Sequence, residues 1–152
     1  FWTLGDLSRA SWGQGWTSVV VAIVLTVLLW ACAPWLDALA SGDSTATAVG
    51  IDPAVIRVLL LVPVSAGVAM AVAISGGIGF VGLVIPHLMR SFIGHGHRRL
   101  VVSSAMAGAV FLMWADTFSR TVFSPAELPI GVITGLLGAP FLLVLVRREA
   151  MA

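Results

Sequence analysis

Four long, mostly uncharged stretches constrain what this chain can fold into. Residues 17–36 carry no charged side chain, and residues 55–75 carry only Arg57, close to their start. Residues 100–122 and 128–146 are the other two stretches, and only the third of the four has charges near its end. A helix crosses the apolar core of a bilayer with about 20 residues. The sequence therefore predicts an all-α, polytopic transmembrane helical bundle.

The composition supports a membrane protein and excludes several functions. Charged residues make up 10% of the chain, whereas soluble domains carry about 25%. The chain has no lysine, so it cannot form a P-loop, and any energy from ATP must come through another chain. No stripe of basic residues suggests nucleic-acid binding. We expect no catalytic residue and no cofactor in this chain, and because it begins with Phe1 we expect a piece of a longer protein.

A fifth apolar segment has to be separated from the second. The uncharged run from Val58 to Met89 is too long for one crossing, and Gly76 and Gly77 are the natural break. This leaves a short helix over residues 78–93. Interrupted apolar helices are typical of transporters, where they line a pathway.

The break contains G-x-G-x-x-G at Gly77, Gly79 and Gly82. A dinucleotide site needs a strand before this motif and an acidic residue about 20 positions later, whereas here the next acid is Asp116. We therefore interpret these glycines, with Pro86, as a helix break. They either let helices approach closely or let the segment line a path.

The distribution of arginines orients the chain but does not count its crossings. With five crossings or with four, the arginines divide six to two between the two sides of the membrane. In both cases residues 90–99 and Arg147 fall on the arginine-rich side, which is the cytoplasmic side by the positive-inside rule.

Three histidines, His87, His95 and His97, raise the possibility of a metal site. A catalytic metal site needs about three protein ligands, and no Asp, Glu or Cys lies near them in the sequence. We favour a cationic loop, with His87 packing against a neighbour or capping a helix, and we predict no metal. Cys32, the only cysteine, is expected to pack as a small apolar residue.

Two charged residues lie inside the third long stretch. Asp116 and Arg120 are four residues apart, so they share a helix face and can pair. Ionisable residues at membrane depth are usually functional, but an arginine near a helix end can reach the interface. Structural pairing and contact with a partner both remain open.

The polar residues 37–53 separate the first two long stretches. Within them, residues 41–50 predict a short helix that Ser41 or Asp43 would cap and Gly50 would stop.

Several blocks together resemble a known family. "GGIGFVGLVIPHLMRSFIGHGHRR", "AGAVFLMWADTFSR" and "AELPIGVITGLLGAPFLLVLVRR" resemble the ABC-importer permeases for iron–siderophores, haem and cobalamin. "LASGDSTATAVGID" is similar to that family's Leu-Gly-Glu…Ala…Leu-Gly loop, with Ser41 in place of Leu and Asp43 in place of Glu. "FWTLGDLSRASW" also looks like a family segment, with Asp6 as a departure.

The resemblance covers nearly the whole chain, but family members are about twice as long and have ten helices. It therefore implies the C-terminal half of a permease subunit. It also implies five crossings, at about 17–36, 55–75, 78–93, 100–122 and 128–146.

The resemblance also implies roles for particular residues. Residues 40–51, within a coupling segment 40–53, would dock on an ATPase subunit that holds ATP and Mg²⁺. Arg120, supported by Asp116, would face an extracytoplasmic substrate-binding protein. The residues of the coupling segment that match the family motif are Gly42, Asp43, Ala46 and Gly50. The glycines that would lie near the axis of a permease dimer are Gly131, Gly135 and Gly138.

The implied function is ATP-driven import, by alternating access, across a bacterial cytoplasmic membrane. The implied substrates are iron–siderophore complexes first, with haem and cobalamin as the family's other substrates. A zinc/manganese-type permease is one alternative, and it should show metal-liganding residues inside its spans. A channel or scaffold component without an ATPase is the other. The sequence does not identify the substrate or distinguish a homodimer from a heterodimer.

Overall fold

The computed structural model describes Gly5 and residues 11–94, 96–122 and 129–150. Within these residues every regular element is a helix, so the all-α prediction is confirmed. The helices, in chain order, are α1 (Trp12–Ala31), α2 (Ala33–Ala40), α3 (Asp43–Ala48), α4 (Pro53–Ser75), α5 (Val81–Ile93), α6 (His97–Val122) and α7 (Ile130–Ala150).

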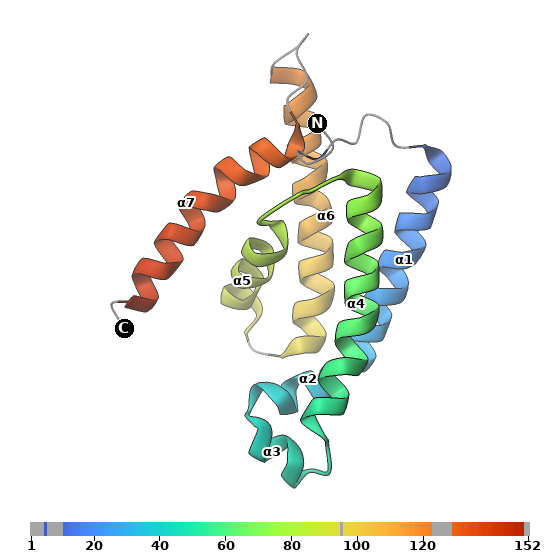
Figure 1. The fold of residues 1–152 in the computed structure, drawn as a ribbon. Coiled ribbons are helices and arrows are strands. Elements are labelled where there is room, and N and C mark those ends of the chain that lie inside the picture. Colours follow the sequence, from blue (N-terminus) through green and yellow to red (C-terminus); the bar gives the residue numbers. More distant parts are fainter. Residues whose placement is uncertain (1–4, 6–10, 95, 123–128, 151–152) are drawn as a thin grey trace.

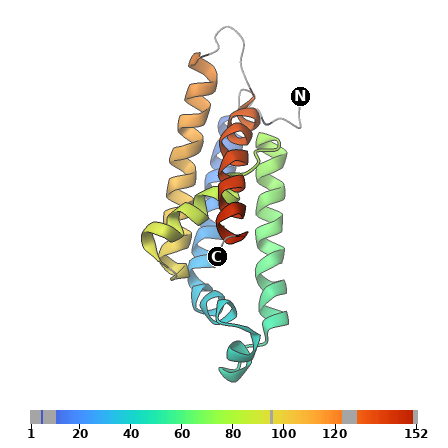
Figure 2. The ribbon, with the colours of Figure 1, turned by 90° about the vertical axis from the view of Figure 1, so that its left-hand side faces the viewer.

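Three long helices form the body of the molecule (Figure 1). α1 packs against α4 and α6, while the shorter α5 packs against α6 and α7. α2 and α3 together form a small cap, hereafter the α2–α3 cap, at one end of these helices (Figures 1 and 2). Along the chain, α1, α4, α5, α6 and α7 run alternately toward the cap and away from it. The elements that join the cap to the opposite end are α1, α4 and α6, each of which contacts α2 or α3.

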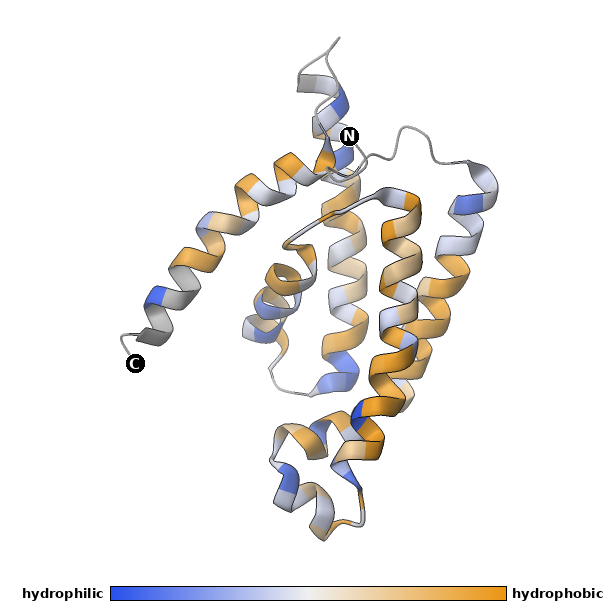
Figure 3. Cartoon of the chain, viewed as in Figure 1, coloured by the Kyte–Doolittle hydropathy of each residue, from blue (hydrophilic) through white to orange (hydrophobic). Residues whose placement is uncertain are grey.

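The lengths of the helices match a membrane environment. α1, α4 and residues His97–Thr121 of α6 are long and apolar enough to cross a bilayer, by length and composition. α5 and residues Ile130–Leu143 of α7 are shorter apolar helices. Apolar residues cover most of the body of the bundle, and polar residues gather at the helix ends and in the α2–α3 cap (Figure 3).

Little of this chain is buried within itself. Its accessible surface is 10273 Å², whereas a compact soluble protein of 15.8 kDa exposes about 7,300 Å². Large apolar side chains such as Val62 on α4, Met113 on α6 and Leu143 on α7 are well over half exposed. Such a surface is stable only when lipid or further protein covers it.

The first helix begins and ends earlier than the predicted span 17–36. Ser11 starts α1 with a capping box, in which its hydroxyl accepts from the Gln14 N–H and the Gln14 side chain accepts from the Ser11 N–H. Pro34 lies in the first turn of α2, where its missing N–H and fixed φ are tolerated but would have disrupted a continuous helix. The chain therefore divides here into two helices, and Cys32 at the junction is buried, as predicted.

The second break lies where the glycines predicted it. α4 ends at Ser75, and Gly76 follows with a φ of 71°, a conformation that favours glycine. α5 begins at Val81, three residues later than the predicted start at residue 78, because Phe80 occupies the N-cap position with a φ of 67°. The break therefore extends over residues 76–80.

Candidate functional site

The α2–α3 cap is built around two glycines. Gly42 precedes α3 with a φ of 108°, a conformation that side chains strongly disfavour. Neither Ser41 nor Asp43 caps α3, so this part of the prediction is wrong. The Ser41 hydroxyl instead donates to the Asp37 carbonyl at 3.0 Å, and Asp43 lies in the first turn, where the helix dipole favours a carboxylate.

Gly50 ends α3, as predicted. It has a φ of 81°, and its N–H donates to the Thr47 carbonyl at 3.0 Å. The Ile51 N–H reaches back to the Ala46 carbonyl at the same distance. Ala46 itself is fully buried, so it fixes how α3 sits in the cap, while much of the rest of α3 is exposed.

An ion pair links the cap to α4. Arg57 Nη2 lies 2.6 Å from Asp43 Oδ1, and both side chains are about half exposed. Exposed ion pairs contribute at most about 1 kcal/mol. The contact therefore helps to orient α3 more than it stabilises the fold.

A second polar link, which no pattern in the sequence predicts, joins the cap to α6. Asp37 Oδ1, on α2, accepts from the backbone N–H of His97 at 3.1 Å and lies 2.5 Å from His97 Nδ1. Because a carboxylate only accepts, His97 Nδ1 is the donor. These two bonds hold the pKa of Asp37 below its usual range, and the bond from the His97 side chain has the larger effect.

No acid lies near His97 in the sequence. Its partner, Asp37, is sixty residues away, so local sequence patterns could not reveal the contact. The only local signal was Gly96, which precedes the helix and has no side chain to cap it. Next along the chain, the Arg98 guanidinium lies over the Trp30 ring, with Cζ 5.0 Å from the ring centroid. The start of α6 therefore contacts both α2 and the end of α1.

At the opposite end, Asp116 and Arg120 pair as predicted. Arg120 Nε lies 3.0 Å from each carboxylate oxygen of Asp116. The Arg120 side chain is 43% exposed, so it is held by its neighbour and still accessible. The geometry is compatible with both the structural and the docking interpretation.

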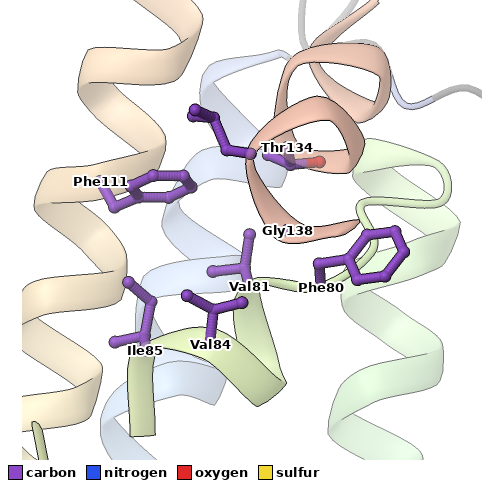
Figure 4. Close-up of a pocket in the computed structure, with 8 residues that line it drawn as sticks. Phe80, Val81, Val84, Ile85, Phe111, Thr134 and Gly138 are labelled. Carbon is purple, nitrogen blue, oxygen red and sulfur yellow. The ribbon is translucent and has the colours of Figure 1, made fainter. Parts of the chain in front are cut away.

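The helix break meets α7 through Phe80 (Figure 4). A Cβ added to Gly138 would lie 2.2 Å from Phe80 Cβ, so only glycine allows this contact. Gly135 is 3.9 Å from the same ring by this measure, an ordinary contact, and the Gly131 carbonyl accepts from the Thr134 hydroxyl. An apolar cavity of ≈ 40 Å³ lies beside this contact, lined by Phe80, Val81, Val84, Ile85, Phe111, Thr134, Leu137 and Gly138.

The other predicted break residues differ in their surroundings. Gly79 and Gly82 face open space, so no close helix approach in this chain explains them. The Gly77 carbonyl approaches Gly5, and Pro86 lies inside α5. That these four residues line a translocation path stays a prediction.

The two described histidines, His87 and His97, belong to no group of potential metal ligands. Among the described residues, no three His, Cys, Asp or Glu side chains come close enough to share a metal ion. His87 packs edge-on against Phe141 of α7 with ring centroids 5.9 Å apart, as predicted. His95 lies outside the described residues.

The fold and its polar contacts define a helical membrane protein with a polar cap at one end. Comparison with known proteins gives the family. Residues 1–148 match the FecCD transport family, and the chain belongs to that family. The resemblance identified from the sequence is thereby confirmed.

Three curated relatives show the range of the family. The chain is 41% identical to the hemin transport system permease protein HmuU of Yersinia pestis over 97% of its length and 44% of that protein's. It is 40% identical to the vitamin B12 import system permease protein BtuC of Vibrio vulnificus, over 98% and 45%. It is 43% identical to the Fe(3+) dicitrate transport system permease protein FecD of Escherichia coli, over 97% and 47%.

A solved structure has the same fold. It is described as an inward-facing conformation of a metal-chelate type ABC transporter, and it superposes with a TM-score of 0.89 at 34% identity. The alignment covers 97% of this chain and 48% of that one. The chain thus spans about half the length of the relatives it matches.

Proposed function

We propose that this chain is part of a permease subunit of an ATP-driven importer. The observation that carries the proposal is the α2–α3 cap, whose two positive-φ glycines and buried Ala46 fall at the motif positions of the family's coupling loop. Family membership over residues 1–148 supports it. In the full-length protein, the cap would dock on an ATPase subunit, and a second permease subunit would complete the path.

The charges support a cytoplasmic position for the cap. Arg57, Arg90, Arg98 and Arg99 lie at the cap end of their helices, and the basic end of α7 points the same way. Positively charged residues mark the cytoplasmic side of membrane proteins. We propose a bacterial cytoplasmic membrane as its location, supported by the bacterial permeases that it resembles.

We propose metal chelates as the substrate class, with iron–siderophore complexes first. The support comes from the relatives' names, which specify hemin, vitamin B12 and ferric dicitrate, and from the metal-chelate transporter that shares the fold. All of these are bulky chelates, in contrast to free ions. A free-ion permease needs ligands in its path, and the described residues contain no group of three that could provide them.

The proposed mechanism is alternating access without chemistry in this chain. ATP binding and hydrolysis in the partner ATPase would change the relative stability of outward-facing and inward-facing states. A partner shifts such an equilibrium only by its differential affinity for the two states. The permease would therefore have to present a different cap surface in each state.

The coupling role can be tested at the two glycines. In the full-length permease, Gly42→Leu and Gly50→Leu should abolish substrate-dependent stimulation of ATP hydrolysis while membrane insertion is retained, because neither positive φ suits leucine. Gly13→Leu, at an exposed position with no neighbour within 4 Å, is the matched control. Labelling of a Ser44→Cys variant from outside intact cells would contradict the proposal.

The second partner would be an extracytoplasmic substrate-binding protein that docks near Arg120. Arg120→Glu should weaken its binding at least tenfold at low salt, and the loss should shrink at high salt because exposed charges are screened. Wild-type affinity at low salt would leave only the structural interpretation of the Asp116–Arg120 pair.

The remaining alternative is a channel or scaffold component that works without an ATPase. Co-purification distinguishes the two. The complex that we propose retains an ATPase subunit through detergent extraction, whereas a scaffold would not.

A further inference from the structure

The long helix α6 begins without a cap of its own. The first bond of the helix runs from the Leu100 N–H to the Gly96 carbonyl, so Gly96 is the N-cap residue. An N-cap side chain normally accepts from a free N–H of the first turn, and glycine has none to offer. Asp37 of α2 takes this role by accepting from the His97 N–H.

The same carboxylate oxygen also binds the His97 ring, so the two bonds fix both the backbone and the side chain of one residue. A negative charge at this position is further favoured by the dipole of α6. The His97 side chain is 16% exposed and that of Asp37 is 48% exposed, so water is kept from one side of the contact only. Two bonds to Asp37 thus hold the cap to α6, whereas the single Asp43–Arg57 ion pair links it to α4.

α6 is also the element that reaches the opposite end. Its 26 residues extend about 39 Å at 1.5 Å per residue, from His97 to the turn that carries Asp116 and Arg120. α1, α5 and α7 all pack against it. A displacement of its first turn would therefore be felt by three other membrane helices.

We propose that Asp37 and His97 form a joint that transmits a movement of the α2–α3 cap to α6, and through α6 to the opposite end. This inference rests on the proposed function, because the cap moves only if it docks on an ATPase. Asp37 and His97 are positioning residues, since they would contact neither substrate nor nucleotide. The two ends of the importer would then communicate through α6.

The experiment uses the full-length permease, reconstituted in vesicles with its ATPase and binding protein. Asp37→Ala should lower transported substrate per ATP hydrolysed roughly tenfold, as expected for loss of a hydrogen bond to a charged group. ATP hydrolysis itself and co-purification of the ATPase should stay at wild-type levels. Arg99→Ala, which removes an exposed side chain from the same first turn of α6, is the matched control and should change coupling less than twofold, as expected for a surface substitution.

Two substitutions at His97 distinguish loss of the hydrogen bond from loss of the side chain as a whole. His97→Asn places an amide donor near the position of Nδ1 and should retain most of the coupling, whereas His97→Ala should behave like Asp37→Ala. If Asp37→Ala does not fold, Asp37→Asn keeps an acceptor oxygen without the charge and should show an intermediate loss.

A distance measurement gives a second readout that needs no transport. Spin labels at Ser44→Cys on α3 and Thr117→Cys on α6, both exposed positions, report how firmly the cap is held to α6. We expect a narrow distance distribution in the otherwise wild-type permease and a clearly broader one with Asp37→Ala. An equally narrow distribution, or unchanged coupling, overturns the joint.

The two proposals fail in different ways. If the wild-type permease binds no ATPase, the proposed function is wrong, and the label distances still show whether Asp37 holds the cap to α6. If the wild-type complex imports substrate and Asp37→Ala imports it equally well per ATP, only the joint is wrong.

Discussion

The two ends of this bundle are held together by different physical means. At the α2–α3 cap, polar side chains join residues far apart in the chain, with separations of 60 for Asp37–His97 and 14 for Asp43–Arg57. At the opposite end, the charged pair is local, within one turn of α6. There, contact between elements depends on shape, with Phe80 fitting against Gly138.

The difference follows from the two environments. In a membrane, the hydrophobic effect does not drive helices together, because lipid tails are as apolar as the side chains. Helices associate where small residues permit close approach. Outside it, water competes for every polar group, and a link persists only where several bonds converge or partial burial protects it. The cap should therefore respond to pH and salt, and the break near α7 should respond to side-chain volume.

The largest expected effect tests the shape-dependent end. Gly138→Ala should destabilise the full-length permease by about 1–3 kcal/mol, because the added Cβ meets the Cβ and ring of Phe80 and forces α7 away. The measurement is the thermal unfolding midpoint in detergent.

Gly135→Ala is the matched control on the same helix, because its added Cβ would make only an ordinary contact. It should leave stability unchanged or raise it by up to about 1 kcal/mol through helix propensity. Equal losses for the two variants would show that α7 is not packed by shape at Phe80.

A smaller effect tests the polar end through pH. The pKa of Asp37 is lowered by its bonds to His97, so the stability that Asp37 contributes is fully present above its unfolded value of about 3.9. This contribution to stability is lost as the pH falls through the lowered pKa that Asp37 has in the folded state. Acidification from pH 5 to below pH 4 should therefore lower the midpoint of the wild type more than that of Asp37→Asn.

That comparison also needs a control at the cap. Asp43→Asn removes the other acid and should leave the acid-induced loss largely in place. Identical acid profiles for the wild type and Asp37→Asn would show that the link to His97 does not contribute to stability.

The smallest expected effect concerns the local pair. A double-mutant cycle with Asp116→Ala and Arg120→Ala should give a coupling energy of about 0.3–0.5 kcal/mol, typical of i, i+4 pairs. Unfolding in detergent at low and high salt would measure it. A coupling energy above about 2 kcal/mol would show that the opposite end is also held by a strong polar link.

The sequence by itself determined the membrane-length helices, the break and the local pair. Apolar runs of membrane length require helices, since lipid offers no partner for free backbone groups. Gly76 ends α4, Gly50 ends α3, and Asp116 meets Arg120 because each depends only on residues within a turn or two. The family, too, could be identified from such short blocks.

Only the tertiary structure decided which distant residues meet. Asp37 caps α6 because the fold returns the chain to the cap after one membrane-length helix, the break and the short α5, and no local pattern predicts that return. Gly42 rather than Ser41 is the N-cap residue of α3, since the turn from α2 requires a positive φ. Gly138 is needed because Phe80, at the start of another helix, occupies the space where a side chain would stand. Each of these depends on how elements pack, and packing is decided by the whole chain and not by neighbouring residues.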